Sequence, residues 1–453
     1  MNIIIVGCGK VGQTLAGQLN EEGNNITVID LDSARVNSLI SRQDIMGIVG
    51  NGATHAVQVK AGIDKADLLI AVTGSDELNL LCCLTARMAG QCKTIAQVKN
   101  PVYHADAAFL KDELGLAMVI NPEQAAAAEI ARILRFPSAI KIDTFAKGKV
   151  ELIKFRLPEN CPIVGMTVRE AVSGLGCDVL FCTVERGDQA YIVNGDFIFA
   201  ERDILSIIAS PRQVAAFFRK INYKSRAVKD VLIAGGGEMT HYLTDILRRS
   251  GIAVKIIEKD MNLCESMSNL WPDVTVVRGD AVDKDLLLEE GITNAGAFVA
   301  LTNLDEENIM LSLFAQSVGK CKIVTKINRI DFDEVIKRLE LDSIIYPKHI
   351  TAEQIERYAR AAGNTVGSNM ETLYHVISGR VEAAEFTVSD HSKVTDTPLS
   401  RLSCKEGVLV AAIIRGGNVI IPHGQDTIQV GDSVVIVSKL TATMVHDLCD
   451  ILE

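Results

Sequence analysis

The stretch IIIVGCGKVG, residues 3 to 12, decides the fold, because it places a glycine-rich turn directly after an apolar strand and before a helix. The same pattern recurs as VLIAGGGEMT, residues 231 to 240, an offset of 228. Each copy is followed by a second strand that ends in an acid, ITVID at Asp30 and VKIIE at Glu258. The chain is therefore a tandem duplication, and a fold prediction for one half applies to the other.

The duplication extends along both halves. At an offset of 229, AVTGSDELNL (71 to 80) matches ALTNLDEENI (300 to 309). Further on, NPEQAAAAEIAR (121 to 132) is similar to YPKHITAEQIER (346 to 357), and NGDFIFAERD (194 to 203) to HGQDTIQVGD (423 to 432). Each half therefore contains two parts in the same order.

The two parts of each half have different secondary-structure patterns. The first part alternates apolar strands with helix-period segments, which is typical of a doubly wound parallel sheet of the Rossmann type. The second part shows several short strands and few helical patterns, which predicts a small α+β domain. The predicted class is α/β, with two tandem Rossmann-like domains, each followed by a small α+β domain. The predicted domains are 1–137 (Rossmann-like), 138–224 (small), 225–367 (Rossmann-like) and 368–453 (small).

The amino-acid composition and the net charge exclude several classes of protein. The 453 residues are 48% hydrophobic and 23% charged, as in ordinary globular proteins, and the net charge of -11 argues against a nucleic-acid partner. The start, MNIIIVGCGK, is typical of a first strand rather than a signal peptide, and no apolar run is long enough to span a membrane. We expect a cytoplasmic protein whose eleven cysteines, with no CxxC pair, are buried reduced thiols. No metal site is expected.

The glycine turn of the first copy predicts a nucleotide-phosphate site. Gly7 permits a tight turn, Gly9 lets backbone N–H groups approach a pyrophosphate, and Gly12 lets the helix pack against the strand. The phosphate is expected near residues 9 to 11, at the positive end of the helix dipole. Asp30 can accept hydrogen bonds from both ribose hydroxyls and would repel a 2′-phosphate, so NAD is favoured over NADP.

The second copy is expected to be a weaker dinucleotide site. Thr240 replaces the third glycine, and its branched side chain should displace the helix or redirect its N-terminal amides. Glu258 replaces the aspartate and could still hold a ribose. For either copy, the alternative is a glycine-rich turn that binds nothing.

Polar residues at the other strand ends have two interpretations. Thr73 with Gly74, and Thr302 with Asn303, could contact a nucleotide, or they could serve only turn chemistry. Asp76 begins the next predicted helix, where we expect it to cap the helix, and Asp305 is its equivalent.

Taken together, these motifs resemble the domains that regulate K⁺ conductance (RCK domains), and among them the TrkA family of peripheral subunits of bacterial Trk-type potassium uptake systems. The resemblance covers the whole chain and also includes GNGA, IAQVKNP, RGDA and YPKH. It implies a cytosolic nucleotide-binding regulatory subunit, a homo-oligomer (dimer or tetramer), that associates peripherally with the inner face of the plasma membrane. The implied partner is a membrane K⁺ transport subunit, and the implied cofactors are NAD⁺ or NADH, with ATP and ADP as further candidates.

The resemblance also implies the residues of two nucleotide sites. Many members of the family carry a basic residue where this chain has Gln97, whereas Lys326 keeps a positive charge in the second copy. The first site would comprise Gly7, Cys8, Gly9, Lys10, Val11, Asp30, Thr73, Gly74 and Gln97. The second would comprise Gly235, Gly236, Gly237, Glu238, Met239, Glu258, Thr302, Asn303 and Lys326.

The main alternative function is that of an NAD-dependent oxidoreductase, because the same glycine pattern serves hydride transfer. Such an enzyme needs an acid or base facing the nicotinamide. We expect no catalytic residue, since the histidines occupy no position shared by the two halves. A nucleotide-binding scaffold for some other membrane protein is a third possibility.

Overall fold

The chain folds into two compact units, each built from two separate stretches. Residues 1–131 and 228–356 form the first unit, and residues 132–227 and 357–453 form the second. The computed structural model describes residues 1–137, 139–158, 160–187, 189–223, 228–328, 333–363, 369–377, 380–390, 392–440, 445 and 447–452. The predicted domain boundaries, at residues 138, 224, 367 and 368, lie at residues outside that description. We call residues 1–131 the first module and residues 228–356 the second module.

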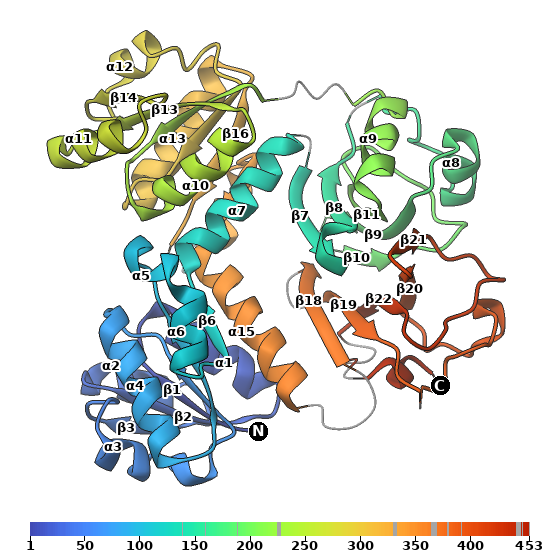
Figure 1. Ribbon diagram of the computed structural model, residues 1–453. Coiled ribbons are helices and arrows are strands. Elements are labelled where there is room, and N and C mark those ends of the chain that lie inside the picture. The colour runs from blue at the N-terminus through green and yellow to red at the C-terminus, as the bar shows by residue number, and fades with distance from the viewer. Residues whose placement is uncertain are drawn as a thin grey trace. The chain divides into compact units, whose positions relative to one another are not determined.

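The first module contains a six-stranded parallel sheet in the order β3-β2-β1-β4-β5-β6 (Figure 1). Helices cover its faces, which is why the central strands are apolar on both sides; all four residues of LLIA in β4 are buried. The strands are β1 (Asn2–Val6), β2 (Asn25–Asp30), β3 (Met46–Val49), β4 (Leu68–Ala71), β5 (Lys93–Gln97) and β6 (Met118–Ile120). The helices are α1 (Lys10–Glu21), α2 (Ser33–Ile40), α3 (His55–Lys60), α4 (Asp76–Ala89), α5 (Pro101–Ala105), α6 (Ala107–Glu113) and α7 (Pro122–Arg135), which continues into the second unit.

The second module repeats this architecture with the strand order β14-β13-β12-β15-β16-β17, also parallel. Its strands are β12 (Asp230–Ala234), β13 (Ala253–Glu258), β14 (Thr275–Arg278), β15 (Ala297–Ala300), β16 (Lys322–Lys326) and β17 (Ser343–Ile345). Its helices are α10 (Glu238–Arg249), α11 (Met261–Leu270), α12 (Lys284–Glu289), α13 (Asp305–Val318), α14 (Asp333–Arg338) and α15 (Pro347–Gly363).

The strand order of each module reverses between its first strand and the neighbour on the other side, β1 with β4 and β12 with β15. Open parallel sheets bind ligands outside the carboxyl ends of the strands at such a reversal. Both glycine turns follow the first strand of their module, so they lie at this point. The prediction of two Rossmann-like domains is confirmed.

The second unit contains two five-stranded antiparallel sheets, in the orders β10-β9-β11-β8-β7 and β18-β19-β22-β20-β21. The first sheet is accompanied by helices α8 (Val168–Leu175) and α9 (Pro211–Lys220), as predicted for a small α+β domain. Each module is followed by an antiparallel sheet, in agreement with the predicted fold class. Its strands are β7 (Ala139–Phe145), β8 (Val150–Arg156), β9 (Leu180–Arg186), β10 (Gln189–Ile192) and β11 (Ile204–Ala209). Those of the second are β18 (Asn369–Ile377), β19 (Val381–Thr387), β20 (Val408–Arg415), β21 (Asn418–Ile420) and β22 (Ser433–Lys439).

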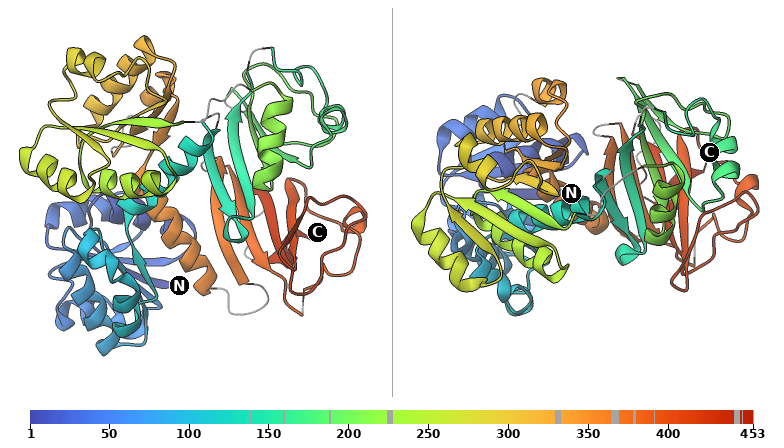
Figure 2. Two further views of the ribbon diagram at one scale, coloured as in Figure 1. Left: turned by 45° about the horizontal axis from the view of Figure 1, so that its top comes forward. Right: turned by 90° about the horizontal axis from the view of Figure 1, so that it is seen from above.

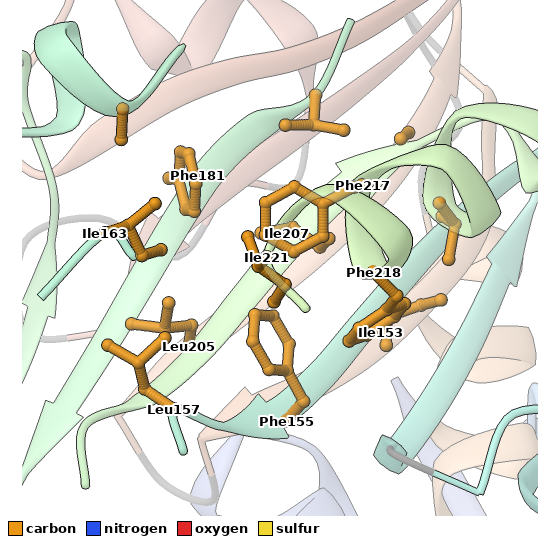
Figure 3. Packing of buried hydrophobic residues seen from close by; sticks show 14 of the residues in the cluster. Ile153, Phe155, Leu157, Ile163, Phe181, Leu205, Ile207, Phe217, Phe218 and Ile221 are labelled. Carbon is orange, nitrogen blue, oxygen red and sulfur yellow. The ribbon is translucent and has the colours of Figure 1, made fainter. Parts of the chain in front are cut away.

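Apolar side chains fill two kinds of core in this unit. Figure 3 shows the core of the first small domain, where Phe155 and Phe181 of the sheet face Phe217 of helix α9. A second cluster joins the two sheets, and in it the ring of Phe145 meets the ring of Tyr374 edge-on at 5.1 Å. The two small domains therefore share part of their hydrophobic core.

Candidate nucleotide-binding sites

The glycine turn of the first module needs glycine at two positions for steric reasons. Gly7 has a φ of +106°, and a Cβ there would lie 2.9 Å from the carbonyl of Val72. A Cβ on Gly12 would lie 1.8 Å from the carbonyl oxygen of Gly7, so helix α1 packs directly onto the turn. Around Gly9, by contrast, a Cβ would meet nothing within 4 Å. The space in front of α1 is therefore open to a ligand.

The first residues of α1 and α10 leave backbone N–H groups for such a ligand. The residue before each helix is a glycine, Gly9 or Gly237, and neither position has a side-chain cap. In contrast, Asp32 caps α2 and Asp260 caps α11 through side-chain hydrogen bonds. Uncapped N–H groups at a helix N-terminus carry partial positive charge and bind phosphate oxygens.

The second module accommodates threonine without a change in the turn. Gly237 has φ -71° and ψ -176°, close to the -68° and -175° of Gly9. The Thr240 side chain is fully buried, and its hydroxyl donates a hydrogen bond of 2.6 Å to the carbonyl oxygen of Gly235. We expected threonine to displace the helix or redirect its amides, but the matching torsions show no redirection at the helix start. The Thr240 hydroxyl forms a hydrogen bond with the carbonyl of Gly235, so the close approach of the side chain to that carbonyl becomes a favourable contact.

The two acids occupy equivalent positions and make equivalent hydrogen bonds. Asp30 Oδ2 accepts the N–H of Cys8 at 2.6 Å, and Oδ1 accepts the N–H of Asp32 at 2.9 Å. Glu258 Oε2 accepts the N–H of Gly236 at 2.6 Å, and its Oε1 accepts another backbone N–H at 2.7 Å. Each carboxylate therefore fixes its glycine turn at the strand end, where a ribose would lie.

Cys8 lies in the first turn but is unsuited to nucleophilic chemistry. Its side chain is completely buried. Burial, reinforced by the negative charge of Asp30, raises the pKa of the Cys8 thiol to about 12. The thiol is therefore neutral at physiological pH, and a neutral thiol is a poor nucleophile and metal ligand.

The ends of β4 and β5 are joined by a buried asparagine, and the second module repeats this arrangement. Asn79 accepts the N–H of Thr73 at 2.8 Å and donates to the carbonyl of Gln97 at 2.9 Å. Asn308 makes the corresponding bonds to Thr302, at 2.8 Å, and to Lys326, at 3.0 Å. The asparagine thus positions the predicted site residues on two neighbouring strands.

The alignment of residues 71–80 with 300–309 pairs Asn79 with Asn308, but the sequence pattern does not predict what they do. The signal in the sequence is a polar residue repeated at the same place in both halves. The structure shows that both asparagines are buried. Gly74 and Asn303, which follow the two threonines, are exposed beside the turn. The structure therefore brings the predicted residues of each site to one edge of its sheet.

The expected capping by Asp76 and Asp305 is corrected. Ser75 provides the side-chain cap of α4. Asp76 instead accepts the backbone N–H groups of Lys99, at 2.9 Å, and Asn100, at 2.8 Å. Asp305 similarly accepts the N–H of Asn328 at 2.8 Å. Each aspartate is the first helical residue, from which its carboxylate reaches the loop after the next strand.

The two candidate sites differ in charge where β5 and β16 end. Gln97 is 1% exposed, and its Oε1 has no hydrogen-bond partner. Lys326 is 6% exposed and donates from Nζ to the carbonyl of Leu301 at 3.2 Å. Burial lowers the pKa of Lys326, and the charges of Glu123 and Asp305 oppose that shift. The second candidate site therefore holds a buried amine where the first holds a neutral amide.

Comparison with known families agrees with this geometry. Residues 3–122 and 231–347 match the TrkA-N domain, and residues 152–222 and 383–444 match the TrkA-C domain. The chain belongs to the TrkA family. Each of the two family domains therefore matches twice, once in each half of the chain, as the fold repeats.

Relatives of this TrkA-family chain match it along nearly its whole length. The Trk system potassium uptake protein TrkA of Halomonas elongata is 32% identical, over 96% of this chain and 95% of that protein. The TrkA homolog 1 of Methanosarcina mazei is 30% identical, over 98% of both chains. Among solved structures, the GsuK RCK domain has a TM-score of 0.63 at 18% identity and covers 97% of this chain and 92% of that one. The GsuK channel bound to NAD has the same score and identity, with 97% and 77% covered. These structural matches support the fold.

The described cysteines, carboxylates and helices of this TrkA-family chain form, by their geometry, no metal site, disulfide or membrane-spanning helix. Within the part that the structure describes, no three His, Cys, Asp or Glu side chains gather so as to hold a metal ion. All eleven cysteines are described and free, eight of them buried and three partly buried. No helix among the described residues has both the length and the apolar character needed to cross a bilayer.

Proposed function

We propose that this chain is the cytosolic regulatory subunit of a Trk-type potassium uptake system, and that it controls a membrane K⁺ transport subunit in response to adenine nucleotides. The observation that carries the proposal is the repeated site: an open, uncapped helix N-terminus after a glycine turn, with a carboxylate fixed beside it, in both modules of a TrkA-family chain. NAD⁺ or NADH is the main ligand proposed, and ATP and ADP are further ligands.

The mechanism follows from the linkage between binding and conformation. A nucleotide moves the partner only if it binds two arrangements of the subunit with different affinities. Phosphates at the start of α1 or α10 would pull on helices that pack against the sheets, and the carboxylates of Asp30 and Glu258 would fix the ribose. The chain would act as a dimer or tetramer at the inner face of the plasma membrane.

Two measurements test the proposal. Calorimetry of the chain, purified without detergent, against NADH, NAD⁺, ATP and ADP should show binding of at least one nucleotide below millimolar concentration. Deletion of the gene should impair growth at limiting K⁺, and the wild-type gene should restore it. Normal K⁺ uptake by the deletion strain when no other importer is present would contradict the potassium function. The absence of binding by any nucleotide would contradict the regulatory mechanism.

A further inference from the structure

The two acids reach the same place beside their turns although their side chains differ in length. Asp30 Oδ2 accepts the N–H of Cys8 at 2.6 Å. Glu258 Oε2 accepts the N–H of Gly236 at the same distance. The modules that hold them, coloured blue and yellow-green to orange in Figure 2, are copies of one fold with helices beside each sheet. The additional methylene of the glutamate must therefore find room in the second module that the first module fills differently.

Gly236 provides that room because it has no side chain. A Cβ at this position would lie 3.0 Å from Cγ of Glu258 and 3.1 Å from its Oε2, both closer than ordinary van der Waals contact. Cγ of glutamate is the methylene that aspartate lacks. Gly236 does not have a positive φ, so glycine serves space here rather than torsion. A side chain at this position and a glutamate at the strand end therefore compete for one volume.

Met267 of helix α11 fills the rest of this volume. Its methyl carbon Cε would lie 2.5 Å from a Cβ on Gly236. The Met267 side chain is 5% exposed, so it belongs to the core of the second module. The methyl group of Met267 therefore takes the place that a side chain after the first glycine would take.

The first module fills the equivalent volume with a different set of side chains. The offset of 228 that relates the two turns pairs Cys8 with Gly236 and pairs Leu39, on α2, with Met267. Cys8 is completely buried, and Leu39 is 5% exposed. The branched leucine is shorter than methionine, and Cys8 supplies the Cβ and the sulfur that Gly236 lacks. Each set thus keeps its volume nearly constant, as close-packed interiors require.

We infer that the residue after the first glycine, together with the core residue of the following helix, positions the ribose-binding carboxylate of each module. Cys8 and Leu39 require aspartate in the first site, and Gly236 and Met267 require glutamate in the second. These residues act through the acid rather than on the ligand. The inference deepens the proposed function, on which it rests. Both sites are thereby set for the same ligand chemistry, an adenosine ribose with free 2′ and 3′ hydroxyls.

An acid from the wrong set should be misplaced. In Asp30→Glu, the added methylene meets the Cβ of Cys8 as closely as a Cβ at Gly236 would approach Glu258, so the carboxylate must leave the turn. In Glu258→Asp, the carboxylate stops short of the Gly236 N–H. In both variants the phosphates keep their uncapped helix N-terminus, while the ribose loses its carboxylate. The defect is therefore specific to ribose recognition.

Calorimetry of the full chain measures the first site when Glu258→Ala weakens the second, and this variant is the parent of the test. NAD⁺ and ATP are each compared with the analogue that carries 2′-deoxyadenosine, and the ratio of the two affinities measures ribose recognition. The parent should prefer the ribonucleotide by about ten-fold, as expected for a hydrogen bond to a charged group. Asp30→Glu should reduce this preference below about two-fold. A change that only loosens the fold would weaken both nucleotides equally.

Rescue by the second module's set separates positioning from general damage. Adding Cys8→Gly and Leu39→Met to Asp30→Glu should restore the preference to within about three-fold of the parent's, because the three residues act as one coupled set. Asp44→Glu is the same change at an exposed aspartate of the first module. It is the matched control and should leave the preference unchanged.

The reciprocal exchange applies the test to the second site, in an Asp30→Ala background. Glu258→Asp alone should lose the ribose preference. Adding Gly236→Cys and Met267→Leu should restore it. This arm decides the question if the first triple variant does not fold.

The inference is wrong if Asp30→Glu keeps the parent's preference, or if neither triple variant regains it. Binding of nucleotide by the parent leaves the proposed function standing in both cases. A parent that binds NAD⁺ or ATP without preferring the ribonucleotide also overturns the inference. A wild-type chain that binds neither nucleotide contradicts the proposed function itself.

Discussion

At the scale of single residues, Asp30 at the end of β2 and Glu258 at the end of β13 make equivalent hydrogen bonds, although their side chains differ in length. The extra methylene of Glu258 is taken up without lengthening its bond to the turn, which is 2.6 Å as in Asp30. In both cases one carboxylate oxygen holds the glycine turn and the other holds the segment after the strand. The carboxylates are therefore structural elements of the glycine turns as well as candidate ribose ligands.

We predict that Asp30→Ala weakens NADH binding more than Glu258→Ala does. Helix α1 begins with Lys10, whereas α10 begins with Glu238, so the side-chain charge at the phosphate end of the helix favours an anion in the first site and opposes it in the second. Calorimetry of the two single variants checks the order. Equal losses, or a larger loss from Glu258→Ala, would reject the inequivalence of the sites.

A second residue-scale prediction concerns the threonine that replaces a glycine. Thr240→Gly removes a buried hydroxyl that bonds to Gly235, so the second module should lose about 1–2 kcal/mol of stability. The single tryptophan, Trp271, is buried in the second module, and its fluorescence during urea unfolding reports the change. Thr240→Ser keeps the hydroxyl and should lose less. If Thr240→Gly is as stable as the wild type, the hydroxyl bond contributes nothing.

At the scale of elements, the duplication made the fold of each module predictable. It did not predict the contacts between distant segments of the chain. The glycine turn, strand and acid lie within a short stretch of sequence, so their geometry follows from local pattern. The bond from Asp76 to the loop at Lys99 joins residues far apart in sequence, and nothing in the pattern distinguishes it from a helix cap. The hydrogen bond from the Tyr242 hydroxyl to the carbonyl of Lys99 depends on how two modules pack, which periodicity does not encode.

The start of α7 gives a prediction with a pH signature. Burial raises the pKa of Glu123 above its unfolded value, and Lys326 and Lys99 offset only part of that effect, while Glu238 adds to it. The stability that Glu123 contributes is therefore fully present below its unfolded pKa and is lost as pH rises through the folded pKa. Glu123→Gln stays neutral, so it should match the wild type near pH 4 and exceed it near pH 7.5.

Urea unfolding at the two pH values, followed by Trp271, measures this difference. The control is Glu265→Gln, an exposed change on α11, which should give no such pH dependence. A Glu123→Gln variant that is less stable than the wild type near pH 7.5 would show that the attraction to Lys326 outweighs the cost of burial.

At the scale of the whole molecule, the small domains should unfold together because they share a core. Phe145 is fully buried in the cluster that joins their two sheets. Phe145→Ala should cost about 3–5 kcal/mol and lower the melting of both small domains in one calorimetric transition. Tyr374→Phe, which removes the hydroxyl bond to the carbonyl of Thr144, should cost about 1 kcal/mol. Separate melting of the two domains in wild type would contradict a shared core.

The joining of two modules in one polypeptide also frees them from a constraint of symmetry. In a symmetric dimer of identical chains, every residue at the contact appears twice, so an acid placed against one site is placed against both. Here the equivalent positions carry Glu123 and Lys348, so the two modules differ at this place. A mutation in this single gene can therefore change one module's helix start and leave the equivalent position of the other module unchanged.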